Sequence, residues 1–73
     1  MKVKDILPEY PLNNITVRMN DPWEDNMLFG YCAWDGKNLI SLDGDSYYLD
    51  EEIVKYEYDA VGNLTYWISG QWI

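Results

Sequence analysis

Turn signals at regular intervals constrain the fold of this chain more than any other feature. Glycine, proline, asparagine and aspartate interrupt it at a spacing of roughly 8–12 residues, which is typical of small all-β domains. The segments between them are short and rich in β-branched and aromatic residues, which suit strands. Asp35-Gly36 and Asp43-Gly44 are strong hairpin signals. The chain is therefore predicted to form short strands joined by tight turns.

Alternation of apolar and polar residues, or a short continuous apolar run, marks about five or six strands. Gly30 interrupts one such run and predicts a bulge or a bend there. The strands following Asp35-Gly36 and Asp43-Gly44 are expected to complete an antiparallel meander. The predicted strands are Ile15–Met19, Met27–Trp34, Asn38–Leu42, Ser46–Leu49, Ile53–Tyr58 and Leu64–Ser69.

A chain of 73 residues is expected to be a single small globular domain, residues 1–73. We predict a mostly β fold, either a small SH3-like barrel or a curved antiparallel sheet, with a short helical turn before Pro8. An α+β fold with a helix near residues 50–58 is the alternative, because Asp50 could cap it. The strand is preferred there because valine and tyrosine favour extended backbone.

Aromatic bulk argues that the chain folds despite its high charge. Four Trp, seven Tyr and one Phe supply large apolar surfaces to bury. Disordered acidic segments are poor in such residues. The single cysteine, Cys32, lies within the apolar run Met27–Trp34 and is predicted to be buried.

Several classes of chemistry are excluded by residues that the chain lacks. It has no histidine, the usual general base, and one cysteine is too few for a zinc site of Cys and His ligands. An EF-hand starting at Asp43 fails, because Tyr48 stands where glycine is required and Val54 where glutamate is required. We therefore expect no enzymatic activity, no cofactor and no metal.

Acidic residues dominate the surface that the chain can present. There are 13 Asp and Glu against 5 Lys and Arg, a formal charge of −8. Such a charge repels nucleic acid and attracts basic protein surfaces. No apolar stretch approaches the roughly 20 residues of a membrane span, and the N-terminus does not resemble an export signal. The expected location is the cytoplasm, without direct contact to nucleic acid or membrane.

Three acidic loops are the candidate partner-binding site. Carboxylates brought together there would resemble the repeated phosphates of a nucleic-acid backbone. Trp23, between Pro22 and Glu24, is a candidate interface residue, and so is whichever of Tyr47 and Tyr48 faces outward. Charge that only maintains solubility is the alternative interpretation. The candidate site residues are Asp21, Trp23, Glu24, Asp25, Asp43, Asp45, Asp50, Glu51 and Glu52.

Two segments, Met1–Leu7 (MKVKDIL) and Asp35–Asp50 (DGKNLISLDGDSYYLD), resemble small acidic proteins of phages, prophages and mobile elements of Gram-positive bacteria. Anti-CRISPR proteins belong to this population. The resemblance implies an inhibitor that acts inside a bacterial cell on a nucleic-acid-handling protein. A small assembly module that self-associates through a strand edge, Ser46–Leu49 or Leu64–Ser69, is the second hypothesis. The expected state is a monomer or a weak homodimer.

Overall fold

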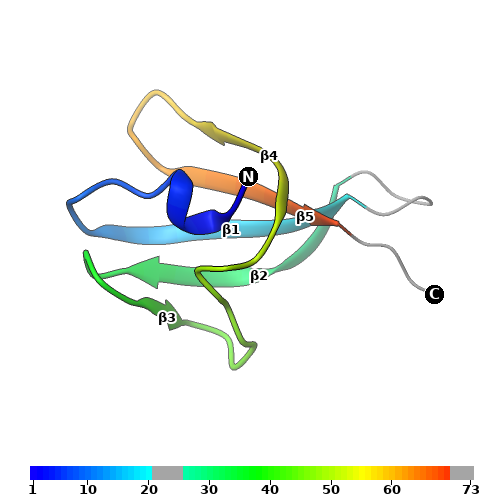
Figure 1. The fold of residues 1–73 in the computed structure, drawn as a ribbon, viewed down its shortest axis with the longest axis horizontal. Helices are drawn as coiled ribbons and strands as arrows, with labels where there is room; N and C mark the ends of the chain where they lie inside the picture. The colour runs from blue at the N-terminus through cyan, green and yellow to red at the C-terminus, as the bar shows by residue number, and fades with distance from the viewer. Residues whose placement is uncertain (21–25, 70–73) are drawn as a thin grey trace.

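The protein forms one small, mostly β structure, as predicted. The computed structural model describes residues 1–20 and 26–69. A short 3-10 helix packs against a five-stranded sheet (Figure 1). The elements are η1 (Val3–Asp5), β1 (Leu12–Asn20), β2 (Met27–Trp34), β3 (Leu39–Ser41), β4 (Ile53–Tyr58) and β5 (Leu64–Ser69).

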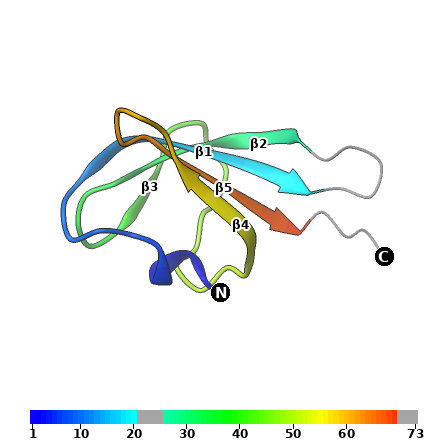
Figure 2. The same cartoon turned by 90° about the horizontal axis from the view of Figure 1, so that it is seen from above.

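The strands lie in the order β3-β2-β1-β5-β4 in a twisted sheet (Figure 2). Three neighbouring pairs are antiparallel, whereas β1 and β5 run parallel at the centre. Among the described strands, β3 and β4 each have a partner on one side only. The mostly β fold is as predicted, but the described strands form an open sheet and not a closed barrel, and the parallel pair of β1 and β5 makes it mixed and not wholly antiparallel.

One face of the sheet, the core face, carries the buried side chains. Ile15 and Val17 on β1 stand beside Leu64 and Tyr66 on β5, and all four are at most 1% exposed. Cys32 lies opposite Ile15 and is buried as predicted. Burial raises the pKa of its thiol to about 11, so the thiolate is scarce at neutral pH.

The N-terminal helical turn forms as predicted and covers part of the core face. Val3 in η1 is fully buried, and Ile6 directly after it is nearly so. Pro8 follows, and its carbonyl oxygen accepts a hydrogen bond of 2.8 Å from the indole Nε1 of Trp34. The turn is thereby joined to β2.

Residues 42–52, here called the crossing loop, were predicted wrongly in part. Ser46–Leu49 is not a strand. Because β3 and β4 are opposite edges, the loop between them must cross the whole sheet, about 19 Å for four strand spacings. It runs over the core face (Figure 1), where Tyr47 and Leu49 pack against the core. Its backbone pairs with η1 instead, through Lys4 N–H to Leu49 O at 3.0 Å.

The strands β4 and β5 have the bounds that the sequence predicts. Ile53–Tyr58 is a strand, so the alternative of a helix near residues 50–58 is wrong. Leu64–Ser69 lies between β1 and β4 and is not an edge. Neither segment proposed for edge-to-edge association can therefore serve that role, since the first crosses the sheet and the second is paired on both sides.

Candidate functional site

The crossing loop carries the described part of the predicted partner-binding site. It contains Asp43 and Asp45 near its start and Asp50, Glu51 and Glu52 near its end. The other predicted residues, Asp21, Trp23, Glu24 and Asp25, lie outside the described residues. All ten acidic side chains in the described ranges are exposed, including these five.

Asp43 fastens the crossing loop to β2. Its Oδ2 accepts hydrogen bonds of 2.7 Å from the Tyr31 backbone N–H and of 2.7 Å from the Tyr47 hydroxyl. Its Oδ1 accepts from the Asp45 backbone N–H at 3.1 Å. The Tyr47 hydroxyl is the main cause, and the Tyr31 N–H the second, of a pKa lowered below that of an ordinary aspartate. The carboxylate is thus engaged within the protein.

Two further aspartates organise turns in the same way. Asp35 accepts from the backbone N–H groups of Asn38 and Lys37 at 2.6 and 2.7 Å. Asp59 accepts from those of Asn63 and Val61, both at 2.9 Å. These backbone donors, those of Asn38 and Asn63 foremost, lower the pKa of each carboxylate. Turn chemistry therefore accounts for part of the acidic excess.

These lowered pKa values predict an acid-sensitive fold. A carboxylate whose pKa is lower in the folded than in the unfolded chain stabilises the fold above the unfolded pKa and loses that contribution as pH falls. Chemical unfolding should give a constant free energy between pH 7 and 5, and a falling one below about pH 4. Substituting Asp35→Asn and Asp59→Asn together should flatten the decrease, and an unchanged slope would contradict this assignment.

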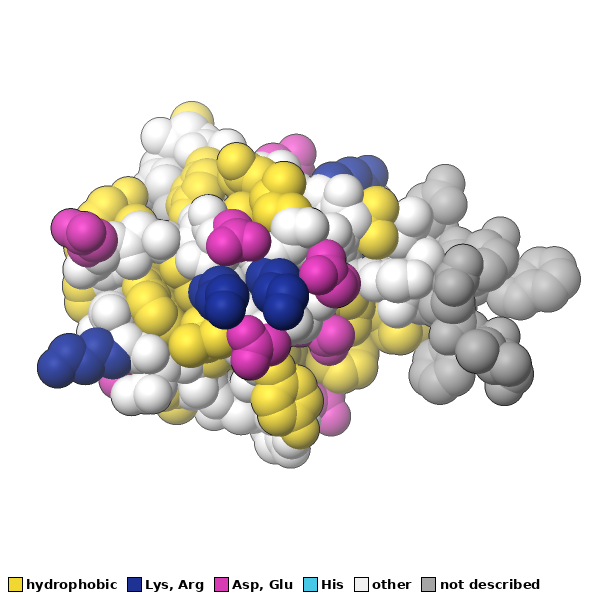
Figure 3. Space-filling model, in the orientation of Figure 1, with side chains coloured by type: hydrophobic (Ala, Val, Ile, Leu, Met, Phe, Trp, Pro, Cys, Tyr) yellow, Lys and Arg dark blue, Asp and Glu magenta, His cyan; other side chains and the backbone are white. Residues whose placement is uncertain are grey.

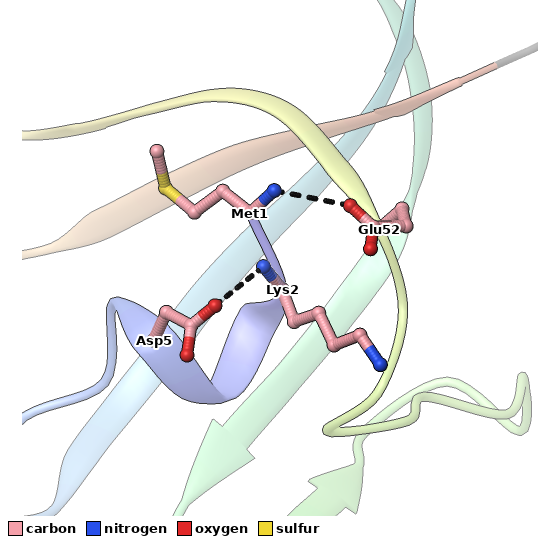
Figure 4. Close-up of polar contacts among 4 residues, drawn as sticks. All are labelled: Met1, Lys2, Asp5 and Glu52. Carbon is pink, nitrogen blue, oxygen red and sulfur yellow. Dashed lines mark hydrogen bonds and ion pairs between the residues drawn. The ribbon is translucent and has the colours of Figure 1, made fainter.

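Asp50 and Glu52 lie beside positive groups of the N-terminal segment. Lys4 Nζ is 3.2 Å from Asp50 Oδ1, and the Met1 amino group is 3.0 Å from Glu52 Oε2. Figure 4 shows the Glu52 contact next to the bond from Lys2 N–H to Asp5, 2.9 Å long. On this face of the molecule two adjacent basic side chains are surrounded by acidic ones (Figure 3). The predicted acidic cluster is consequently offset by nearby positive charge.

Three exposed side chains of the crossing loop are here called the loop surface: Asp45, Tyr48 and Glu51. Tyr48 is 62% exposed, whereas its neighbour Tyr47 is half-buried, so one of the two faces outward as predicted. No hydrogen bond or ion pair joins the carboxylate of Asp45 or Glu51 to another described residue. An exposed aromatic ring with carboxylates nearby in the sequence, neither of them bonded to a described residue, suits a contact surface.

The sheet face opposite the core, the outer face, carries exposed apolar residues that the sequence prediction missed. Leu28, Tyr31 and Ile40 are 47%, 43% and 46% exposed. Trp67 on the same face is shielded by the Lys55 ammonium, 4.6 Å from its ring centroid. A nearly continuous apolar run such as that of β2 predicts a strand buried on both faces. The run therefore gave no sign that Leu28 and Tyr31 would be exposed.

The described residues form neither a pocket nor a metal site. Within residues 1–20 and 26–69 the surface has no pocket. In the same ranges no three carboxylate or thiol side chains come close enough to hold a metal ion. The helix found in the described part of the chain, η1, is far too short to cross a membrane.

Comparisons of the chain with protein-family models, with curated proteins and with solved structures found no match.

Proposed function

We propose that this protein is a non-enzymatic binding module that attaches to a basic protein surface through its loop surface. The carrying observation is that Asp45 and Glu51, before and after Tyr48 in the sequence, are exposed and have carboxylates unbonded to any described residue, in a chain of net charge −8. A strongly charged surface raises the association rate with a partner of opposite charge. Tyrosine contributes contact area at low entropic cost, which suits the centre of such an interface.

More specifically, we propose that the protein is an inhibitor of the anti-CRISPR kind. It would act inside a bacterial cell on a protein that handles nucleic acid. A protein groove that binds the phosphate backbone is basic and open. The same groove accepts carboxylates that project from a rigid support. The crossing loop has that support, because Asp43 bonds it to β2 and the backbone bond from Lys4 to Leu49 joins it to η1.

The test begins with capture from bacterial lysate at low salt and release at high salt, followed by purification of the released protein. Adding the protein described here should then displace a labelled DNA duplex from the purified captured protein. The double variant Asp45→Lys, Glu51→Lys should weaken this inhibition by about tenfold or more, because like charges then face each other.

A matched control separates the loop surface from net charge alone. The triple variant Glu9→Lys, Asn13→Lys, Asn14→Lys changes the formal charge by the same amount at exposed positions elsewhere. It should inhibit nearly as well as the original chain. Equal loss in both variants, or undiminished DNA binding by the captured protein, would contradict the proposal.

A further inference from the structure

The outer edge of β4 is open along most of its length. Near its start, the Met1 carbonyl oxygen accepts a 2.8 Å bond from Ile53 N–H, and Lys2 bridges to Glu52. Beyond that point, from Val54 to Tyr58, no described strand pairs with this edge (Figure 1). Exposed strand edges are templates for pairing with another strand.

The direction of the free backbone groups follows from the turn after β4. Asp59 N–H donates to Asn63 O at 3.0 Å, so this pair is hydrogen-bonded across the hairpin. In an antiparallel ladder such pairs alternate with pairs whose N–H and C=O groups point away from each other. Tyr58 and Tyr56, opposite Leu64 and Tyr66, are therefore the residues whose backbone groups face outward.

The side chains of this edge are complementary in charge to the same edge of a second, antiparallel copy. Lys55 and Glu57 lie opposite Trp67 and Thr65 of β5 and share the outer face. Tyr56 and Tyr58 occupy the core face, where their rings meet edge to face with centroids 6.2 Å apart. An antiparallel copy centred on Tyr56 would set Lys55 against Glu57 of the second copy, and Glu57 against Lys55.

We propose that two copies of this chain associate through their β4 edges, antiparallel and centred on Tyr56. This register centres on the regular part of the open edge, Lys55 to Tyr58, which follows the register shift between Ile53 and Lys55. It forms two Lys–Glu pairs and brings the two Tyr56 residues together, so the same surface serves both copies. A register centred on Glu57 would place two carboxylates directly opposite each other, which is unfavourable.

The pairing is independent of the proposed partner-binding function, because it uses β4 and not the loop surface. The small area of the paired segment limits the affinity of the dimer. A segment of five residues buries far less than the roughly 1,200 Å² of standard interfaces, so the dimer is weak and depends on concentration. The two sheets together form one continuous sheet with β3 of each copy at the outer edges.

Sedimentation equilibrium over a range of protein concentrations tests the pairing by exchange of charges. Lys55→Glu alone or Glu57→Lys alone sets like charges opposite each other twice per dimer. Each should raise the dimer dissociation constant by about tenfold or more. The double variant Lys55→Glu, Glu57→Lys restores opposite charges and should return the constant to within about threefold of the original.

Two more variants separate pairing from changes in folding or charge. Tyr56→Pro removes an N–H that faces outward, which edge strands tolerate, and should abolish the dimer while circular dichroism stays unchanged. Lys37→Glu, in the turn between β2 and β3, should leave the dimer intact. The double variant lacks the Lys55–Trp67 contact just as Lys55→Glu does, so restored dimerisation reports charge pairing. A chain monomeric into the millimolar range, or a double variant that stays monomeric, would overturn the proposal.

Discussion

Replacing Ile15 by alanine is expected to destabilise the protein by about 2–5 kcal/mol, the cost of a large cavity in a packed core. Ile15 is fully buried at the centre of the sheet, with Leu64 of β5 on one side and Cys32 of β2 on the other. Small domains have thin margins, and folded proteins in general have about 5–15 kcal/mol. The substitution should therefore remove a large share of the total stability.

Urea unfolding followed by tryptophan fluorescence measures this effect. Ile40→Ala provides the control, because Ile40 on the edge strand β3 is 46% exposed and its truncation should cost less than about 0.5 kcal/mol. Similar losses in the two variants would mean that Ile15 does not lie at the centre of the core. An Ile15→Val variant, which keeps most of the volume, should cost only about 0.5–1.5 kcal/mol.

The elements that the sequence predicts are those set by local signals. The Asp35-Gly36 turn between β2 and β3 forms as expected, with Gly36 at a φ of 100° that favours glycine. The strand β5 has the predicted bounds, Leu64–Ser69, and Leu64, Tyr66 and Ile68 lie on its core face. Gly30 adjoins a register shift between β1 and β2, which confirms the predicted bulge.

What the sequence did not predict depends on contacts between distant residues. Nothing local distinguishes Ser46–Leu49 from a strand, because Tyr and Leu favour extended backbone in either case. The segment crosses the sheet because β3 and β4 lie at opposite edges. Those positions depend in turn on the parallel pairing of β1 with β5.

The balance of charge at the candidate site is likewise a matter of tertiary structure. Lys4 precedes Asp50 by most of the chain, yet their charged atoms lie 3.2 Å apart. Adding up charges along the sequence counts Asp50 and Glu52 as free, whereas the fold places positive groups beside both. Exposed pairs of this kind are individually weak, but they make the local potential that a basic partner meets less negative.

Gly30→Ala is expected to destabilise the protein by about 1–3 kcal/mol, the usual cost of overpacking a filled site. Gly30 is buried in β2, and a methyl group there would occupy the space of the Asp43 carboxylate and the Tyr47 hydroxyl. The carboxylate would have to leave the Tyr31 N–H, to which it is bonded at 2.7 Å. The crossing loop would then lose its attachment to β2.

A double-mutant cycle with Asp43→Ala tests this mechanism. Removing the carboxylate empties most of the space that the new methyl group needs, so Gly30→Ala should cost less in that background. Equal costs in both backgrounds would show that the two residues do not interact.

The outcome also bears on the candidate site. If Asp43 holds the crossing loop in place, its substitution weakens partner binding by displacing Tyr48, without any contact of its own. Variants of Asp45 and Glu51, whose carboxylates hold nothing else among the described residues, are consequently the informative ones.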